Sequence, residues 1–192
     1  MGKLIYSMLT SLDGYVSGPD GTFDWVPADE ELHDFVTQQS ASVGTYLNGR
    51  RMYEMMVYWE TAHLERDLPP AMLEFARTWQ GADKIVYSTT LDDVSSKRTR
   101  IERTFDPDAV RKLKAESELD FTVDGPDLAA HAIHAGLVDE YQLYVCPVIV
   151  GGGHRFFPND VRVDLELLDE RRLGNGVMFL RYGVANGLHT ED

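Results

Sequence analysis

Short apolar runs alternate with helical segments through the first 150 residues, and this alternation constrains the fold more than any other feature. The spacing of Leu32, Phe35 and Val36, for instance, places one apolar face on a helix. Alternation of this kind is typical of an α/β sheet with mostly parallel strands, because helices then connect the strands. The expected strands are residues 3–9, 43–47, 84–88, 119–123 and 140–150.

Residues typical of helix N-termini indicate where helices begin between these strands. The segment Pro27-Ala28-Asp29-Glu30-Glu31 opens the first helix, because acidic residues suit the positive end of the helix dipole. Pro69-Pro70 begins another helix, and Asp106 caps a third. A fourth is expected over 127–135, whereas the polar and basic residues 89–103 are expected to form a loop.

The pattern changes after the last of these strands. Residues 163–173 and 177–184 flank Gly174-Asn175-Gly176, which is a hairpin signal. We therefore expect a three-layer α/β fold: a mixed, mostly parallel sheet with flanking helices and a C-terminal β-hairpin. No repeat or linker interrupts the chain, so one domain is expected over residues 1–192, with a frayed tail from about residue 185.

Charge narrows the classes of function. The chain has 18 Lys and Arg against 32 Asp and Glu, a formal net charge of −14 that repels nucleic acid and anionic membranes. No apolar run reaches the roughly 18 residues of a membrane helix. The single cysteine, Cys146, cannot form an intramolecular disulfide. We expect a cytoplasmic protein that binds a small molecule, and neither nucleic acid nor a membrane.

Glycines and small polar residues stand at the expected carboxyl ends of the strands, where α/β sheets bind ligands. Gly49 followed by Arg50 and Arg51 opens a helix, a pattern that suits a phosphate. Three successive glycines at 151–153 favour close approach of a ligand or of another chain. The other candidates at strand ends are Asp13, Gly14, Ser88, Thr89, Gly125 and Pro126.

Other interpretations stay open. The two arginines also fit a plain strand-to-helix turn, and the basic run 97–103 fits either a solvated face or an anion contact. The ordinary dinucleotide fingerprint, the Walker loop and the hydrolase nucleophile elbow are absent. A metal site has little support, because His131 and His134 lack further ligands at suitable spacing.

Several motifs together resemble one family. Ser11-Leu12-Asp13-Gly14, the stretch 49–54 (GRRMYE) and the stretch 136–140 (GLVDE) occur in order, followed by Pro147 and the glycines 151–153. In this order they resemble the dihydrofolate reductase superfamily, in particular the C-terminal reductase domain of the riboflavin-biosynthesis deaminase-reductase. The resemblance implies about eight strands, NADPH as hydride donor, and a pteridine, a ribosylaminouracil-type pyrimidine or a dihydrofolate-like heterocycle as substrate.

The resemblance also assigns roles. Asp29 is the expected heterocycle-binding acid and proton donor, Trp25 walls the pocket, and Glu30 and Glu31 compete with Asp29 for that role. Asp29 also fits a residue of the first helical turn. Met52 stands where the family commonly has Thr or Ser, and Pro126 removes one N–H donor. The implied cofactor residues are Asp13, Gly14, Gly49, Arg50, Arg51, Met52, Ser88, Thr89, Gly125, Pro126, Leu128, Gly151 and Gly152.

Two non-catalytic classes also stay open: a regulator that binds the nucleotide without turnover, and a heterocycle carrier that ignores nicotinamides. A phosphorylated substrate requires a second basic pocket, for which the run 97–103 is the candidate, whereas an unphosphorylated substrate requires none. Because family members are often dimers, a homodimer is expected through the strand near 141–150.

Overall fold

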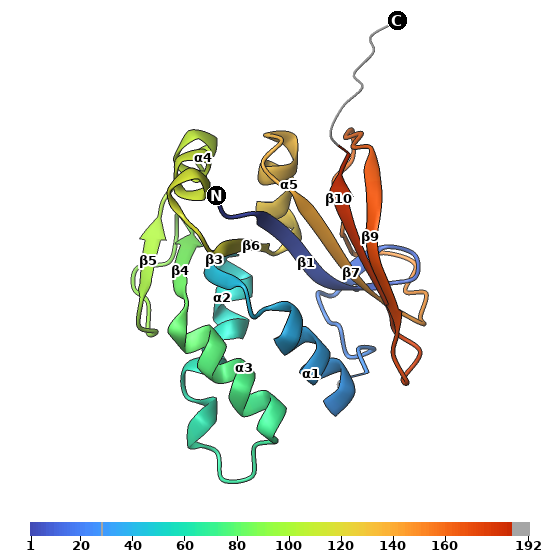
Figure 1. Cartoon of the computed structure of the whole chain (residues 1–192). Coiled ribbons are helices and arrows are strands. Elements are labelled where there is room, and N and C mark those ends of the chain that lie inside the picture. The colour runs from blue at the N-terminus through green and yellow to red at the C-terminus, as the bar shows by residue number, and fades with distance from the viewer. Residues whose placement is uncertain (28, 186–192) are drawn as a thin grey trace, which may run out of the picture.

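The computed structural model describes residues 1–27 and 29–185 and contains one large sheet with helices on both faces (Figure 1). Ala28 and most of the expected frayed tail lie outside the described residues. The strands are β1 Leu4–Ser11, β2 Tyr15–Ser17, β3 Val43–Gly49, β4 Asp83–Tyr87, β5 Thr99–Glu102, β6 Asp120–Asp124, β7 Glu140–Cys146, β8 His154–Arg155, β9 Leu165–Arg172 and β10 Met178–Val184. The α-helices are α1 Glu30–Gln39, α2 Arg50–Met56, α3 Pro70–Gly81, α4 Pro107–Glu116 and α5 Pro126–His134.

Eight strands form the sheet in the order β5-β4-β3-β6-β1-β7-β10-β9. Every pair is parallel up to β7, and β10 is antiparallel to both β7 and β9. The prediction of a mixed, mostly parallel sheet with a C-terminal hairpin is therefore confirmed. β2 and β8 pair with each other as a separate short ribbon.

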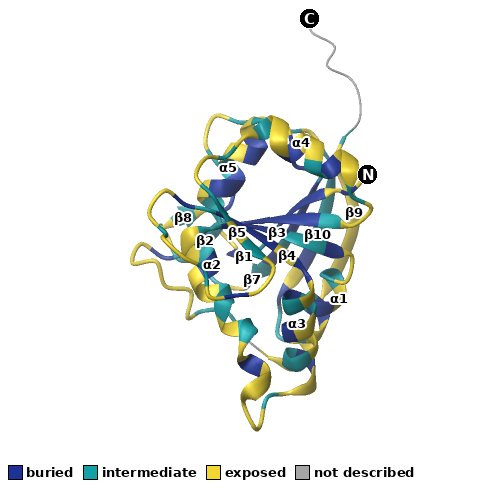
Figure 2. Ribbon diagram, turned by 90° about the vertical axis from the view of Figure 1, so that its left-hand side faces the viewer, coloured by how far each residue is buried: buried dark blue, intermediate teal, exposed yellow. Residues whose placement is uncertain are grey.

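The helices divide between the two faces of the sheet. Helices α4 and α5 cover one face, while α1 and α3 cover the other (Figure 2). Alternation along β3 shows why: Leu47 packs in the core with α5, whereas Tyr46 packs with Trp79 of α3. The apolar periodicity of the sequence thus produces three layers.

Several boundaries differ from the prediction. The segment 89–103 contains β5, an edge strand whose sequence TRIE has one large apolar residue and so carries no hydrophobic pattern. The strand expected over 140–150 ends at Cys146, before Pro147, because proline lacks the N–H that the ladder needs. Two short 3-10 helices, Val57–Glu60 and Ala62–Leu64, follow α2 and were not predicted.

Strand β7 lies inside the sheet, between β1 and β10. Both of its backbone edges are therefore occupied, and a dimer in which two copies pair along β7 is excluded. Within residues 1–27 and 29–185, no helix is both long and apolar enough to cross a membrane.

Candidate functional site

The register of the parallel strands brings the candidate residues together. Gly49 at the end of β3 pairs with Tyr87 of β4, and Asn48 pairs with Asp124 at the end of β6. The loops after these three strands therefore open at one edge of the sheet, where parallel sheets place ligands. Two cavities meet at this edge.

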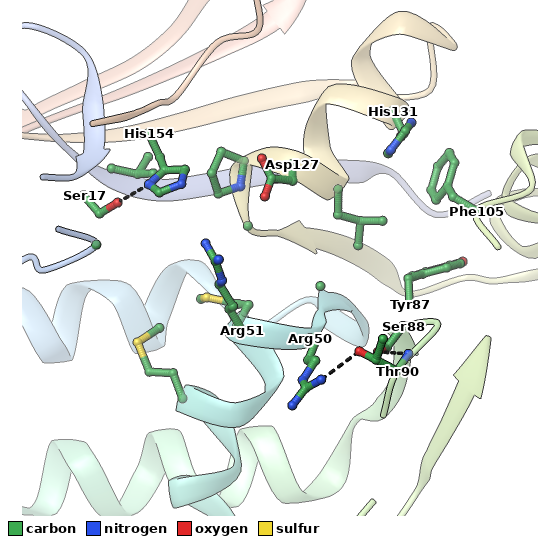
Figure 3. Close-up of a pocket in the computed structure, with 18 of the residues that line it drawn as sticks. Ser17, Arg50, Arg51, Tyr87, Ser88, Thr90, Phe105, Asp127, His131 and His154 are labelled. Carbon is green, nitrogen blue, oxygen red and sulfur yellow. Dashed lines mark hydrogen bonds between the residues drawn. The ribbon is translucent and has the colours of Figure 1, made fainter. Parts of the chain in front are cut away.

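The larger cavity has a volume of about 720 Å³. It lies above the carboxyl ends of β3, β4 and β6, between α2 and the start of α5 (Figure 3). This size is within the usual range of small-molecule sites, roughly 300–1,000 Å³. Nine residues predicted for the cofactor line it: Gly49, Arg50, Arg51, Met52, Ser88, Thr89, Gly125, Pro126 and Leu128.

The large cavity is basic in an acidic chain. Three arginines line it, Arg50, Arg51 and Arg103, against one carboxylate, Asp127. Arg50 donates from Nε to Glu54 Oε1 and from Nη1 to Thr90 Oγ1, both at 2.7 Å. In Figure 3 the Arg51 side chain extends instead toward the gap between His154 and Asp127. The side chains of Arg50 and Arg51 thus lie at different ends of the large cavity.

The start of α5 adds a second source of positive potential. Gly125 has a φ of 99°, a conformation that favours glycine, and it turns the chain from β6 directly into the helix. The first backbone N–H groups of a helix have no partner within it, so those after Pro126 are free to bind an anion. Leu128 and Asp127 of this first turn line the large cavity.

The basic run 97–103 contributes one residue to the site. Arg98 pairs with Asp83 at 3.0 Å, and Arg100 pairs with Glu102 at 3.0 Å. Only Arg103 lines the large cavity, and its Nη1 donates to the carbonyls of Ser88 and Leu91 at 3.0 and 2.7 Å. Arg103 therefore holds the β4 loop in place.

The last glycine of the run 151–153 packs against another segment of the chain. A Cβ on Gly153 would lie 2.0 Å from the carbonyl oxygen of Ser17, so the close approach is to the chain's own backbone. Asp13 accepts hydrogen bonds from the amides of Val150 and Gly151 at 3.2 and 2.8 Å. The predicted cofactor residues outside the cavity linings are Asp13, Gly14, Gly151 and Gly152.

These residues act on the site indirectly. Gly153 allows β8 to lie against β2, and Ser17 Oγ then contacts His154 Nδ1 at 2.9 Å. Both Ser17 and His154 line the large cavity. Gly153 is thus a backbone packing site that positions the cavity wall, while a contact of residues 151–153 with a ligand or another chain stays a prediction.

The smaller cavity has a volume of about 300 Å³ and lies between α1, α2 and the sheet. Its walls are largely apolar, and three methionines of α2, Met52, Met55 and Met56, form one side. Polar groups are confined to a few positions on its floor and rim, among them Asp124 and Gln142. Phe23, Met52 and Met55 line both cavities, so the two are neighbours.

Asp124 was missed by the sequence reasoning. Its carboxyl lies at the floor of the small cavity, and Thr122 Oγ1 donates to its Oδ2 at 2.7 Å. Burial raises the pKa of Asp124 to about 7, against the opposing effect of the Thr122 hydrogen bond. In the sequence, the segment VDGP is typical of a turn, and this obscured the role of Asp124. The feature that could have identified Asp124 is an acidic residue at the last position of a buried strand.

Asp29 and Trp25 lie elsewhere. Asp29 is exposed and caps α1, with Oδ1 accepting from the backbone N–H of Leu32 at 2.9 Å. Trp25 packs partly buried against the cluster that contains Leu32 and Phe35. Neither lines either of the two cavities; the hydrogen bond from Leu32 shows Asp29 as a helix cap, and its role as the acid stays a prediction. Glu31 instead accepts from the backbone N–H of Gly174 at 2.8 Å.

This placement gives a testable expectation for Asp29. Asp29→Ala should cost about 1 kcal/mol of unfolding free energy, because the cap is lost, whereas Asp29→Asn keeps a good cap. We expect both variants to keep the wild-type rate of any reaction the protein catalyses. Urea unfolding and steady-state kinetics measure the two effects. A tenfold loss of rate in Asp29→Asn would restore Asp29 to the chemistry.

No group of three or more potential ligands within the described ranges is placed to hold a metal ion. His131 instead stacks on Phe105, with ring centroids 6.0 Å apart, and Phe105 lies against Tyr87 at 5.3 Å. These three rings gather at one end of the large cavity (Figure 3).

Comparisons with known proteins agree with this geometry. The family model "RibD C-terminal domain" matches residues 2–179. The uncharacterized protein YyaP of Bacillus subtilis is 27% identical over 184 residues, which cover 94% of each chain. A pyrimidine reductase-like protein from Corynebacterium diphtheriae has a TM-score of 0.69 at 16% identity, covering 97% of this chain and 93% of its own.

The fold also matches a dihydrofolate reductase. The enzyme from Enterococcus faecalis, complexed with NADP(H), gives a TM-score of 0.63 at 15% identity. The match covers 96% of this chain and 98% of that enzyme. The fold expected from the sequence motifs is thereby confirmed.

Proposed function

Because the chain belongs to the RibD C-terminal domain family, we propose that it is an NADPH-dependent reductase acting on a heterocycle. The reaction is hydride transfer to the carbon of a C=N or C=O bond, with a proton delivered to the neighbouring atom. The large cavity takes the cofactor, and the small cavity takes the heterocycle. The alternative is a protein of the same fold that binds the nucleotide or the heterocycle without turnover.

One observation carries this proposal. A basic cavity large enough for a dinucleotide and an apolar cavity with a buried acid share a wall, formed by Phe23, Met52 and Met55. A bisubstrate redox enzyme needs this arrangement, because its two reactants must meet with water excluded. A nucleotide-binding regulator has no use for the second cavity.

The residues of the large cavity fit a phosphorylated dinucleotide. Arg51 and the first turn of α5 would hold the pyrophosphate, since both offer donors at the same end of the cavity. Arg50 beside Thr90, together with Ser88, would hold a phosphate on the ribose. Tyr87, Phe105 and His131 would form an aromatic wall beside the base, with the His131 ring stacked on Phe105 and the Tyr87 ring tilted against it. When bound, NADPH supplies the hydride.

The chain's own chemical contribution centres on Asp124. Because burial raises the pKa of Asp124 to about 7, its carboxyl can hold a proton near neutral pH and deliver it to a heterocycle in the small cavity. The apolar walls keep bulk water away from that proton. Asp124 thus takes the role of proton donor that the sequence had assigned to Asp29.

The proposal is tested by titrating the protein with NADPH and NADH and following NADPH absorbance with a panel of pterins, pyrimidines and quinones. Saturable NADPH binding and acceptor-dependent oxidation are the expected results. Binding of NADPH without oxidation by any acceptor would favour the non-catalytic alternative. Absence of NADPH binding would contradict the assignment of the large cavity.

A pair of arginine variants separates the two phosphate positions. Arg50→Ala should weaken NADPH binding roughly 10- to 100-fold and leave NADH binding nearly unchanged, because only NADPH carries the ribose phosphate. Arg51→Ala should weaken both cofactors alike, because both carry the pyrophosphate. Arg66→Ala, an exposed arginine outside both cavities, is the control. Calorimetry gives the dissociation constants, and equal losses for both cofactors in Arg50→Ala would contradict this placement.

The proposed partners are a small heterocycle and a second copy of the chain. Because β7 is interior, such a dimer would use the face of the sheet or the free edges at β5 and β9. The charge of −14 disfavours nucleic acid and anionic membranes as partners, and the basic residues of the site act only locally.

A further inference from the structure

Four polar side chains form a row across the sheet, and three of them, Asp124, Ser7 and Gln142, line the small cavity. Asn48 pairs with Asp124 in the register of β3 and β6, and Ser7 pairs with Gln142 in that of β1 and β7. Tyr6 pairs with Val123, so Ser7 and Asp124 are the next residues along those two neighbouring strands. Neighbours in parallel strands share a face of the sheet, and the four side chains therefore project to the same side.

The row has unused hydrogen-bonding capacity. Asn48 is fully buried, and neither its Oδ1 nor its Nδ2 has a partner among the described residues. Among the described residues, Thr122 alone donates a side-chain hydrogen bond to the Asp124 carboxyl. Ser7 Oγ and Gln142 Oε1 contact each other at 3.3 Å, which leaves the amide nitrogen of Gln142 free. Buried polar groups are rarely left unpaired, so a row of this kind points to a bound polar partner.

The same cavity has no permanently charged basic side chain among the described residues that line it. No lysine or arginine occurs among the described residues that line it, and its titratable side chains other than tyrosines are His33 and Asp124. The basic run 97–103, the candidate for a second basic pocket, is engaged elsewhere through Arg98 and Arg100. A phosphate here would have at most His33 as a cationic neighbour and would face the Asp124 carboxyl group, which is costly.

We infer that the small cavity takes a planar heterocycle that carries no phosphate and presents an edge of N–H and C=O groups to Asp124, Ser7 and Gln142. The inference rests on the proposed function and names the substrate class of that same site. The methionines of α2 pack against the flat apolar body of the ligand, since thioether side chains adapt to aromatic surfaces. The polar edge fixes its orientation.

The test uses three fluorescent probes that differ stepwise: lumazine, ribityl-lumazine and the phosphate ester of ribityl-lumazine. Each is titrated into the full chain saturated with NADP⁺, so that the large cavity is filled, and quenching gives the dissociation constant. We expect the phosphate ester to bind at least about tenfold more weakly than ribityl-lumazine. Equal or tighter binding of the ester would overturn the inference.

Two matched variants on α1 test whether the phosphate ester binds weakly because the small cavity lacks positive charge. Gln39 lines the small cavity in the last turn of the helix, whereas its neighbour Gln38 is exposed and outside it. Gln39→Arg should strengthen binding of the phosphate ester about tenfold, and Gln38→Arg, which adds the same charge, should not. An equal effect of both would overturn the local explanation.

Gln142→Leu tests the polar row itself and should weaken lumazine, the probe without a side chain, about tenfold. Failure of all three probes to bind, with NADP⁺ still bound, would overturn the inference while leaving the proposed function intact for another acceptor. Failure of NADP⁺ to bind would instead overturn the proposed function.

Discussion

Asp124→Asn is expected to lower the turnover of the reductase by about 10²- to 10⁴-fold, the usual contribution of a positioned proton donor. Asparagine has nearly the same shape but cannot deliver a proton. NADPH affinity should stay within about twofold, because Asp124 does not line the large cavity. Stopped-flow measurement of hydride transfer, with separate titration of NADPH, distinguishes loss of chemistry from loss of binding.

The pH dependence provides a second readout for the same residue. Since the pKa of Asp124 is about 7, the protonated donor is present below that pH and is lost above it. The wild-type rate should therefore fall as the pH rises through 7, and the small residual rate of Asp124→Asn should lack this step. A wild-type profile that is flat between pH 5 and 9 would contradict the role of Asp124.

Because Asp124 is buried, the free energy of unfolding should decrease as the pH rises. The Asp124 carboxyl ionises near pH 3.8 in an unfolded chain and near 7 in the folded one. Its contribution is therefore fully present below about pH 4 and is lost as the pH rises through 7, by a few kcal/mol. Relative to Asp124→Asn, the wild-type free energy of unfolding should fall between pH 5 and pH 8 in urea titrations.

Gly153→Val is expected to destabilise the fold by about 3–5 kcal/mol, the range of mutations that force buried backbone apart. A Cβ at this position would lie 2.0 Å from Ser17 O and 2.7 Å from Gly18 C, and the φ of 123° is unfavourable for any other residue. The clash separates β8 from β2 and so displaces His154 from the cavity wall. Cofactor affinity should therefore fall together with the unfolding free energy.

The other two glycines supply the controls. Gly152 has no unusual φ, and an added Cβ would be 3.5 Å from Pro19 Cγ, an ordinary contact. Gly152→Ala should thus be nearly neutral. Gly151→Ala meets open space but has a φ of 73°, so it should cost about 1–2 kcal/mol from backbone strain alone. If Gly153→Val were no worse than Gly151→Ala, backbone packing would not explain the glycine run.

Local signals in the sequence predicted the fold and nine residues that line the large cavity. Gly49 and Arg50 stand between a buried strand and a helix, and neighbouring residues alone are sufficient to identify that junction. The strand end at Ser88 is recognisable for the same reason. These residues meet in the large cavity because parallel strands align their carboxyl ends, a rule that needs no structure.

The rest of the site depends on register and burial, which the sequence does not display. Asp124 looks like a turn residue until β6 is seen to lie between β3 and β1, where its last side chain faces an enclosed cavity. Asp29 is the opposite case, because capping and acid catalysis both use an aspartate before a helix. The edge strand β5 was missed because its partner β4, rather than its own pattern, determines its structure.

The position of β1 has a consequence for the order in which the chain folds. This first strand forms the middle of the sheet, with Leu4 beside Phe121 on one side and Ile5 beside Glu140 on the other. Both neighbours are more than 100 residues away along the chain, so the contact order is high and folding is slow. During synthesis the N-terminal strand lacks a partner until β6 has left the ribosome and lacks its second partner until β7 follows, so its apolar surface stays exposed to chaperones or aggregation over that time.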